Sequence, residues 1–431
     1  MDYFSKKHIL EKFNHAGFQK YLKNTSWLLL SRLFSMVVAF FVGAYVARYL
    51  GPSDFGSVNY IISFVGLFSI LASLGIDSIL VRDLVRLPEK RDSLLGSAFI
   101  IKLIGGITVF FIVFIACFLA IQDSYTRALI IMYSLTMLLQ SLSIIDCYFQ
   151  ANVLAKKTAI VQIGVLIFSS VLKVSFVSLG LGIGWFVFSY VIDAVSTGLG
   201  LIIAYSSLNL SFFSWKFDYF LSKKILSMSW PLILSGMMGM IYLKIDQVMI
   251  GYMLGNYSAG IYAAAVKLSE IWYFIPGIIV SSVIPAIINA KKESVHLYYN
   301  RFKKLYLLLF TLSLLLSISI SFFSKDIVHI IFGDSFTESS SILALYVWAG
   351  IPVFISTAFV QFFIIENMQK KIFFTTAVGA ISNIILNILF IPHYGILGAA
   401  YATLASYTLV VFAALVFKEG RLHVYHTFMG K

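Results

Sequence analysis

Apolar runs of about 20 residues recur along the whole chain and constrain its fold more than any other feature. A helix of that length is what crosses the hydrocarbon core of a bilayer. Hydrophobic residues make up 60% of the 431 residues, charged residues only 12%, and the mean hydropathy is +0.92. A soluble domain carries about twice that charged fraction. The sequence therefore predicts an all-α polytopic membrane protein.

We predict about twelve transmembrane helices from the positions of these runs. They cover residues 26–47, 58–80, 94–121, 128–149, 158–179, 185–206, 229–250, 260–284, 305–323, 341–364, 372–391 and 396–417. They form an N-terminal six-helix half at 24–206 and a C-terminal six-helix half at 229–417. The remaining segments are an N-terminal segment at 1–23, a linker between the halves at 207–228 and a tail at 418–431.

The basic residues predict the orientation of the chain in the membrane. Of its 32 Lys and Arg residues, 24 fall before span one, in the loops that follow even-numbered spans, or after span twelve; three fall in the opposite loops and five inside spans. Loops rich in Lys and Arg are cytoplasmic. Both termini and the linker are therefore predicted to be cytoplasmic. The net charge of +13 reflects this topology and does not indicate nucleic-acid binding.

A short pattern near the end of span one occurs again 204 residues later. In Leu50–Gly56 and in Leu254–Gly260 a Leu-Gly pair is followed, after four residues, by a second glycine. We read this as an internal repeat. Because each half holds six spans, both halves start on the same side, and the sequence predicts two parallel halves around a central cavity. Arg48 is expected to cap the C-terminal end of span one.

Five motifs carry a resemblance to a known family. They are Arg48–Gly56, Leu74–Asp77 with Val81–Asp83, Ile245–Gly251, Ala259–Ala264 and Ile391–Ala400. In this order the chain resembles the Wzx-type polysaccharide flippases, the polysaccharide-transport branch of the multidrug/oligosaccharidyl-lipid/polysaccharide (MATE-like) exporter superfamily. The resemblance runs from about residue 23 to residue 417.

The resemblance implies a function in the bacterial cytoplasmic (inner) membrane. Members of the family that this chain resembles move undecaprenyl-pyrophosphate-linked oligosaccharide repeat units from the inner to the outer leaflet by alternating access. The polysaccharide that is assembled from these repeat units would be O-antigen of lipopolysaccharide, capsule or exopolysaccharide. The implied partners are the lipid-linked glycan, membrane lipids and other membrane proteins of polysaccharide assembly.

Ten ionisable residues lie inside the predicted spans. At about 2.5–3.5 kcal/mol for each charge at a helix centre, their insertion would cost up to roughly 25–35 kcal/mol, which is tolerable only if most of them face a polar interior. The cations are candidates for binding a pyrophosphate in such a cavity. They are Arg32, Lys102, Lys173, Lys244 and Lys267. For Arg32 and Lys244, snorkelling toward the nearer interface is the alternative.

The five acids are candidates for gating or for carrying a coupling proton or sodium ion. Asp193 lies deepest and is the first choice for a coupling residue. Asp77 and Asp146 lie near predicted span ends, where solvation, or partners such as N–H groups and arginine, are alternative explanations; Arg82 lies five residues after Asp77. For Asp246 we favour a structural salt bridge.

Lys267 and Glu270 are three residues apart and share a helix face. They form either a neutralised internal pair or a switch that opens when an anionic substrate takes the lysine. Pro276 follows in the same span, and proline removes a helix hydrogen bond, so a helix kink is expected there.

Other functions find little support in the sequence. There is no phosphate-binding loop for ATP, and no cofactor is expected beyond a coupling H⁺ or Na⁺. No His/Cys cluster has the spacing of metal ligands, and the histidines at 296, 329, 393, 423 and 426 are expected in loops and tails. We expect no enzyme, because the largest predicted external loop, at 324–340, is too short to fold as an active site. The main alternative is a cation-coupled small-molecule exporter of the same superfamily.

Overall fold

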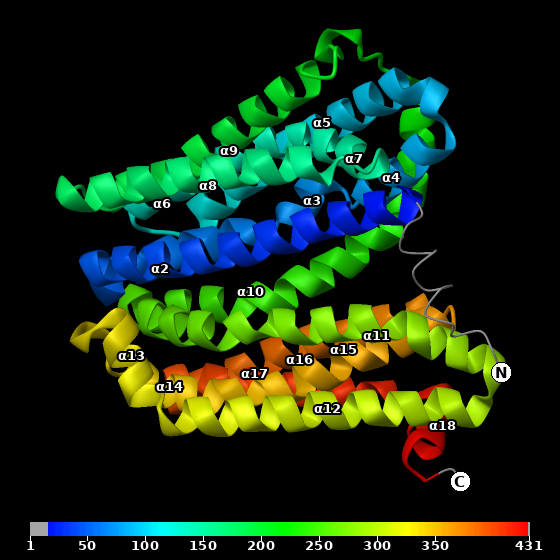
Figure 1. Ribbon diagram of the computed structural model, residues 1–431. Coiled ribbons are helices and arrows are strands. Elements are labelled where there is room, and N and C mark those ends of the chain that lie inside the picture. Colours follow the sequence, from blue (N-terminus) through cyan, green and yellow to red (C-terminus); the bar gives the residue numbers. More distant parts are fainter. Residues whose placement is uncertain (1–15, 430–431) are drawn as a thin grey trace. The chain divides into compact units, whose positions relative to one another are not determined.

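A computed structural model describes residues 16–429, so the predicted N-terminal segment 1–23 lies mostly outside the described residues. Residues 16–429 form helices and contain no strand, which confirms the all-α fold (Figure 1). A helix satisfies its own backbone hydrogen bonds, as a segment inside lipid must. Within residues 16–429, ten helical segments are long and apolar enough to cross a membrane. One of them, Tyr219–Glu293, covers two predicted spans, and another, Leu30–Gly66, extends from the first predicted span into the second. The count of twelve stays a prediction.

The chain divides into two compact units. The first contains Met1–Val46 and Phe68–Leu234, and the second contains Ala47–Leu67 and Ser235–Lys431. These units differ from the predicted sequence halves in one element, because the segment at 47–67 packs with the C-terminal unit. The division into halves at 24–206 and 229–417 stays a prediction.

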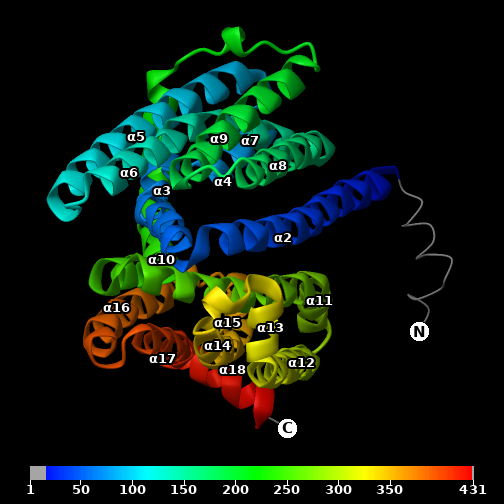
Figure 2. The same ribbon diagram turned by 90° about the vertical axis from the view of Figure 1, so that its left-hand side faces the viewer.

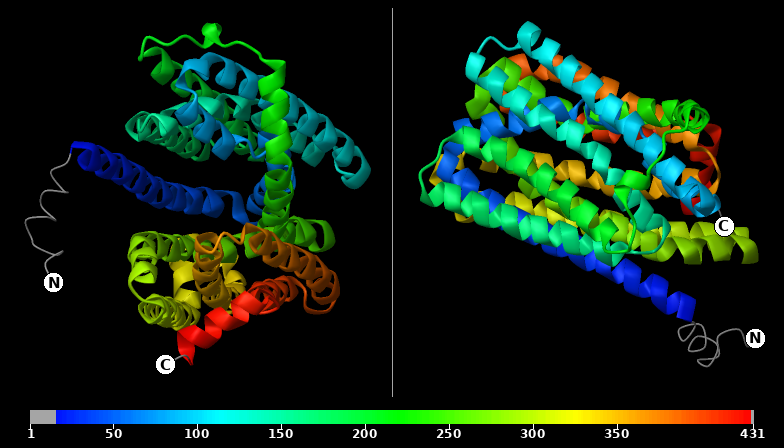
Figure 3. Two further views of the ribbon diagram at one scale, coloured as in Figure 1. Left: turned by 90° about the vertical axis from the view of Figure 1, so that its right-hand side faces the viewer. Right: turned by 90° about the horizontal axis from the view of Figure 1, so that it is seen from above.

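The first unit holds the start of α2, the helices α3 to α9 and the start of α10. The bounds are α2 (Ala16–Gly66), α3 (Ser69–Ser73), α4 (Asp77–Arg86), η1 (Pro88–Lys90), α5 (Arg91–Ala120), α6 (Ser124–Leu139), η2 (Gln140–Ser143), α7 (Ile144–Ala151), α8 (Ala155–Ser178), α9 (Ile183–Ser206), η3 (Phe212–Ser214) and α10 (Tyr219–Glu270). Helix α6 packs between α5 and α9, and α9 also packs on α8 (Figure 3). Buried side chains of α4, α5, α7, α9 and α10 form the core. Helix α10 already covers the second half of the predicted linker 207–228.

The second unit holds the end of α2, the rest of α10 and all later helices. Their bounds are η4 (Ile271–Tyr273), α11 (Phe274–Glu293), α12 (Val295–Phe322), α13 (Ser324–Phe332), η5 (Asp334–Phe336), α14 (Ser339–Tyr346), η6 (Val347–Ala349), α15 (Gly350–Ile365), α16 (Gln369–Tyr394), α17 (Ile396–Ala414) and α18 (Lys418–Phe428). Helix α12 packs against α11, α15 and α18, and α16 pairs with α17 (Figure 2). The core is rich in aromatic side chains from α12 and α15.

The predicted repeat is visible in the backbone. Gly51 (φ 69°, ψ 176°) and Gly255 (φ 84°, ψ 176°) interrupt α2 and α10 with the same conformation. A positive φ is cheap only for glycine. The helical stretches that follow end at Gly66 and Glu270, which are again 204 residues apart (270 − 66).

The two glycines that close this pattern bring two backbones into direct contact within the second unit. A Cβ atom added to Gly56 would lie 1.8 Å from the carbonyl oxygen of Asn256, and one added to Gly260 would lie 1.9 Å from the carbonyl oxygen of Pro52. Such a distance leaves no room for any side chain. Close helix crossings through small residues are common in membranes, where dispersion forces and weak Cα–H···O contacts hold helices together.

Arg48 has a different role from the one expected. Its guanidinium donates hydrogen bonds to the carbonyl oxygens of Ile330 and of Ile331, the latter at 2.9 Å. These carbonyls belong to the last turn of α13. Arg48 therefore caps the C-terminus of α13 and not that of span one, because the chain brings α13 beside the turn.

The five histidines lie on helices, contrary to the expected loops and tails. His423 of α18 is fully buried, stacks on Phe362 with ring centroids 3.8 Å apart, and lies 3.1 Å (Nε2) from the hydroxyl oxygen of Tyr306. It attaches α18 to α12 and α15.

We predict that a single methyl group at the glycine crossing destabilises the protein. Gly56→Ala or Gly260→Ala forces two backbones apart, and overpacking of this kind costs about 3 kcal/mol. Thermal unfolding of the purified protein measures the effect. Gly239→Ala on α10 is the matched control, because its added Cβ meets nothing within 4 Å, and this change should stabilise the helix by about 0.5–1 kcal/mol. Equal melting temperatures for all three variants would contradict a close crossing.

We also predict that low pH weakens the docking of α18 on the second unit. Burial lowers the pKa of His423 from 6.5 to about 3, so the folded state keeps a neutral imidazole while the unfolded state binds a proton below pH 6.5. The contribution to stability is complete above pH 6.5 and is lost as the pH falls toward 3. At about 1.4 kcal/mol per pH unit, α18 should be docked about 2 kcal/mol less stably at pH 5 than at pH 7. Hydrogen exchange of its amides measures the difference.

His423→Gln should remove most of this pH dependence, since glutamine does not titrate. His426→Gln on the same helix should retain it, because His426 is exposed. A pH response that is the same in both variants would assign the effect to other groups.

Candidate functional site

A small pocket in the second unit brings together four of the ten predicted site residues. Its volume is about 90 Å³, and its charged lining residues are Lys244, Asp246, Lys267 and Glu270. It has room for several water molecules or an ion, and it is far smaller than the roughly 300–1,000 Å³ of pockets that enclose whole ligands. The rest of its lining comes from the end of α2, from α10 and from α14, and includes Asn59, Ser63, Gln247, Tyr262 and Tyr346.

The two lysines stand at different depths. Lys244 is half-buried and Lys267 is exposed. The Lys267 ammonium lies 4.4 Å from the centroid of the Phe55 ring, in a cation–π contact. Phe55 is itself packed against Phe332 and Phe336, which fixes its ring in place.

Asp246 is buried at 7% exposure and is held by neutral groups. Its carboxylate accepts hydrogen bonds from Asn387 Nδ2 (2.5 Å), Thr403 Oγ1 (2.5 Å) and the Tyr262 hydroxyl (3.0 Å). Within residues 16–429 it forms no ion pair, so the expected structural salt bridge is wrong. Where no cation is paired with a buried carboxylate, hydrogen bonds from several donors offset the free-energy cost of its desolvation.

Glu270 lies at the end of α10, where the helix is interrupted. It accepts a hydrogen bond from the Tyr346 hydroxyl (3.1 Å), and η4 begins at the next residue. Pro276 lies in the first turn of α11. Its ring would clash with the carbonyl of the residue four positions earlier in a continuous helix, and that residue, Trp272, belongs to η4. The interruption thus lies directly before the proline. The proposed Lys267–Glu270 switch stays a prediction.

In the first unit, Lys102 and Asp77 form a pair. Lys102 is 1% exposed, and its ammonium contacts Asp77 Oδ1 and donates to Ser143 Oγ at 2.8 Å. Cys147 Sγ lies 3.5 Å from the same carboxylate oxygen. The Asp77 side chain is 53% exposed and reaches the surface of the first unit.

Lys173 and Asp193 form a second pair in this unit. Their charged atoms lie 3.2 Å apart, and Ser169 Oγ bridges them at 2.8 Å and 2.9 Å. The ammonium also lies 4.6 Å from the centroid of the Tyr190 ring. Asp193 Oδ1 is buried without a hydrogen-bond partner. Asp193, the acid that we expected to lie deepest in its span, is therefore paired with a lysine.

Arg32 and Asp146 stand apart from these clusters. Arg32 is exposed on α2. Asp146 of α7 accepts hydrogen bonds from the Thr158 hydroxyl and, at 3.0 Å, from Gln150 Nε2. Polar neighbours therefore accompany Asp146, and its role stays a prediction.

The neutral partners of Asp246 were not foreseen. Asn383 and Asn387 of α16 are fully buried, four residues apart and hydrogen-bonded to each other at 3.0 Å. Two asparagines at this spacing within an apolar run share a helix face, which is a signal that the sequence does contain. Among the described residues, no group of three or more His, Cys, Asp and Glu could hold a metal ion.

Known proteins share this fold. A structure described as an inward-facing multidrug resistance MATE family transporter of the MOP superfamily has a TM-score of 0.68, with 15% sequence identity over 92% of this chain and 96% of that one. The lipid II flippase MurJ in an inward closed conformation also has a TM-score of 0.68, with 17% identity over 92% of this chain and 89% of that one. At these identities the likeness concerns the fold alone.

Sequence comparison identifies a more specific relationship. A Haloferax volcanii protein named "Probable flippase AglR" is 26% identical over 264 residues, which cover 56% of this chain and 51% of that protein. The chain thus spans about half the length of this curated relative. The polysaccharide biosynthesis protein family matches residues 21–291, more than half of the 431 residues, and the chain therefore belongs to this family.

Proposed function

We propose that this protein is a flippase that moves polyprenyl-pyrophosphate-linked oligosaccharides from the inner to the outer leaflet of a bacterial cytoplasmic membrane. It does so by alternating access, for the synthesis of O-antigen, capsule or exopolysaccharide. The sugar and the pyrophosphate pass through the protein while the polyprenyl tail remains in lipid. The protein is a transporter and not an enzyme, and other membrane proteins of polysaccharide assembly are its expected partners.

One observation carries this proposal: a polar pocket inside a membrane-spanning unit that is lined by Lys244 and Lys267. Family membership and the fold shared with a lipid II flippase support the same class of substrate. Charge-assisted hydrogen bonds to phosphate contribute about 1.5–3 kcal/mol each, whereas a cation–π contact at an exposed site contributes about 0.5–1 kcal/mol. A hydrogen bond from Lys267 to a pyrophosphate would therefore be stronger than its contact with the Phe55 ring.

The two lysine–aspartate pairs of the first unit have a secondary role in this mechanism. Lys102 and Lys173 already face Asp77 and Asp193 at contact distance. An anionic ligand would have to displace a carboxylate to reach either lysine. For Lys173 the displaced carboxylate is Asp193, 23% exposed, which would be left as a largely buried, unpaired charge. We therefore assign the first contact with pyrophosphate to the pocket lysines. Arg32, exposed on α2, is an additional candidate for this contact.

We favour Asp246 over Asp193 as the residue that couples transport to a gradient of H⁺ or Na⁺. It combines a buried carboxylate with the Thr403 hydroxyl and an asparagine, and Asn387 Oδ1 is buried without a hydrogen-bond partner. Carboxylate, hydroxyl and amide oxygens are the ligands that a hard cation such as Na⁺ prefers. A carboxylate held without a protein cation can accept either Na⁺ or H⁺.

We predict that neutralising the pocket lysines slows transport. Lys267→Gln and Lys244→Gln should each lower the rate at which a lipid-linked oligosaccharide crosses the bilayer of proteoliposomes by about tenfold, the equivalent of one charge-assisted hydrogen bond of about 1.4 kcal/mol. Lys325→Gln on α13 is the control, since this exposed lysine lies outside the pocket. If the pocket variants flip at the wild-type rate and are equally abundant in the membrane, the cationic site is wrong.

A cell without the gene should accumulate lipid-linked repeat units that face the cytoplasm. Labelling of intact cells with a membrane-impermeant glycan reagent measures how many units reach the outer leaflet. Normal labelling would contradict the flippase function. If the protein were instead a cation-coupled small-molecule exporter, which the shared fold also permits, loss of the gene would leave this labelling unchanged and lower the efflux of organic cations.

Two substitutions separate the candidate coupling ions. Asp246→Asn should abolish the stimulation of transport by either ion gradient, because it removes the charge. Thr403→Val removes one oxygen ligand but keeps a titratable carboxylate, so it should weaken the response to a Na⁺ gradient and spare the response to a proton gradient. Thr375→Val is the control, as its buried hydroxyl donates a hydrogen bond to the carbonyl oxygen of Ile372 in its own helix and lies outside the pocket. A full response to both gradients in Asp246→Asn would remove this residue from the coupling mechanism.

A further inference from the structure

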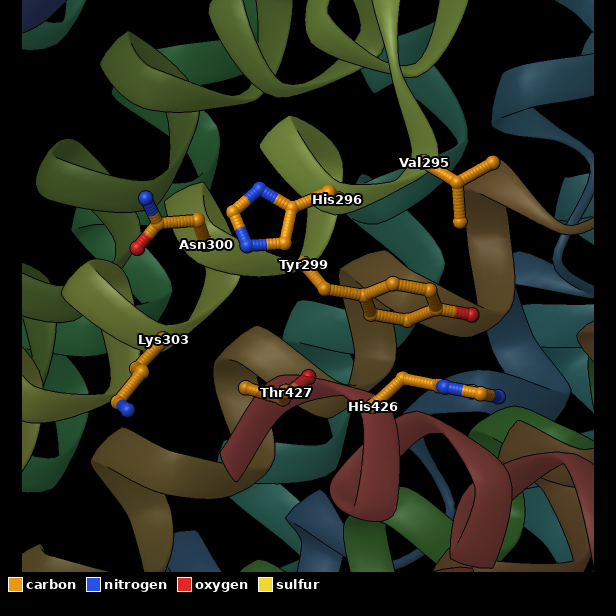
Figure 4. A pocket seen from close by; sticks show the side chains of 7 residues that line it. All are labelled: Val295, His296, Tyr299, Asn300, Lys303, His426 and Thr427. Atoms are coloured by element: carbon orange, nitrogen blue, oxygen red, sulfur yellow. The ribbon is translucent and has the colours of Figure 1, made fainter. Parts of the chain in front are cut away.

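A polar pocket of about 220 Å³ lies between α12 and α18 of the second unit. It shares no lining residue with the pocket that contains Lys244 and Lys267. Its polar lining consists of four side chains from the start of α12 and two from the end of α18 (Figure 4): His296, Tyr299, Asn300, Lys303, His426 and Thr427. The volume is below the roughly 300–1,000 Å³ of pockets that enclose a whole drug-sized ligand, and it suits a small ion or a single charged group.

The wall of this pocket contains a buried hydroxyl that the protein leaves unpaired. Thr427 is 3% exposed, and within residues 16–429 its hydroxyl has no hydrogen-bond partner. Figure 4 shows this side chain at the pocket, with its hydroxyl oxygen toward the side of Tyr299. A buried polar group without a partner is unfavourable, and most such groups in proteins are therefore paired. An unpaired hydroxyl at this place points to a ligand.

The charges around the pocket favour an anion. None of its lining residues is acidic, and Lys303 has no ion-pair partner within residues 16–429. The first turn of α12, which contributes His296, holds no acidic residue, and the side chain of Ser294 before it caps no backbone N–H group. A helix N-terminus of this kind carries a partial positive charge. The C-terminal end of α18 carries the opposite partial charge, of about half a unit, and the full charge of Lys303 exceeds it.

Acidic side chains near this pocket leave its positive charge in place. Residues 291–304 contain five Lys and Arg and one acid, the exposed Glu293. Glu366 of α15 accepts hydrogen bonds from Lys291 Nζ at 2.7 Å and from the Tyr298 hydroxyl at 2.8 Å, and neither donor lines the pocket. The charge of Glu366 is therefore compensated by residues outside the pocket, and the Lys303 ammonium stays available to a ligand.

We propose that this pocket binds a phosphate group. The Lys303 ammonium provides charge-assisted hydrogen bonds, and the Asn300 amide and the Thr427 hydroxyl provide neutral donors from the two helices. A phosphate group has three strong acceptor oxygens that can meet these donors from several sides, whereas the two oxygens of a carboxylate lie in one plane. A soluble phosphate and the phosphate of a lipid headgroup share this chemistry. The Lys- and Arg-rich end of α12 is its predicted cytoplasmic end, within reach of both.

A phosphate in this pocket joins α12 to α18, which makes its binding measurable at α18. A ligand that binds only the docked helix stabilises docking by mass action. Inorganic phosphate, added to the purified full-length protein at constant ionic strength in sodium chloride, should therefore slow hydrogen exchange of the α18 amides. The phosphate concentration that gives half of this protection measures the affinity of this pocket. The assay involves no transport, so its failure would leave the proposed flippase function untouched.

Two neighbouring lysines provide a variant and its matched control. Lys303→Gln should raise the half-maximal phosphate concentration about tenfold, the loss of one charge-assisted hydrogen bond. Lys304→Gln removes the same charge from the next residue, which is exposed and lies outside the pocket, and should leave the affinity unchanged. A general attraction of anions to the basic end of α12 would weaken binding equally in both variants. Binding of inorganic phosphate with the same affinity in both would overturn the proposal.

Substitutions of Thr427 separate a binding role from a structural one. Thr427→Val removes the hydroxyl and keeps the shape of the side chain, and it should weaken phosphate binding about fivefold, the loss of one neutral hydrogen bond. Because this hydroxyl has no partner in the protein, the melting temperature of the ligand-free variant should not fall. Thr427→Ser keeps a hydroxyl and should retain the affinity. A lower melting temperature of Thr427→Val with unchanged phosphate binding would overturn the role of Thr427 as a ligand.

A second arm of the experiment identifies the source of the phosphate. Phosphatidylglycerol bound to the delipidated full-length protein is counted by native mass spectrometry for Lys303→Gln and for Lys304→Gln. Equal lipid binding by the two variants, with tighter binding of inorganic phosphate by Lys304→Gln, supports the site and assigns it to a soluble phosphate. Less bound lipid in Lys303→Gln, with no protection of α18 by inorganic phosphate, supports the site and assigns it to a lipid headgroup. If neither probe distinguishes the two variants, the proposal is wrong.

Discussion

The contact between Gly56 and Gly260 determines the geometry of the second unit. Two backbones meet there without side chains between them, and two crossing helices separate with distance from their crossing point. One and two turns further on, Asn59 and Ser63 face Ala263 and Lys267, and all four line the charged pocket. These positions repeat the offset of 204 residues (263 − 59, 267 − 63). The pocket exists because the crossing is too close for side chains and the space beyond it is not filled.

Much of this arrangement could be predicted, because it depends on local sequence. The Leu-Gly pattern pointed to the repeat, whose glycines Gly51 and Gly255 interrupt α2 and α10, and four of the ten charges within apolar runs line the pocket. Contacts between distant helices could not be predicted. Asp246 depends on Asn387 and Thr403, which lie 141 and 157 residues away, and no local pattern links them. The order of the coupling candidates changed for this reason: Asp193 lies deeper in its span, but it faces Lys173.

The buried charges inside the membrane-spanning helices have partners of two kinds. Lys102, at 1% exposure, faces a carboxylate, whereas the buried Asp246 is surrounded by neutral donors. An ion pair of opposite charges can compensate itself, but it then has little affinity left for a ligand. A carboxylate that is held by neutral donors can exchange those donors for a cation. The clusters of the two units therefore differ in kind: ion pairs in the first, and a carboxylate among neutral donors in the second.

Helix interruptions connect this pocket to motion in the proposed mechanism. A short 3₁₀ segment within a long helix often marks a hinge, and η4 lies directly between Glu270 at the pocket and Pro276 in α11. Glu270 is tied to Tyr346, the residue just before η6, which interrupts a second predicted span. A ligand that changes the charge around Glu270 therefore acts on two interruptions through one hydrogen bond. Binding and bending share the same residues, so no longer path through the protein is needed to couple them.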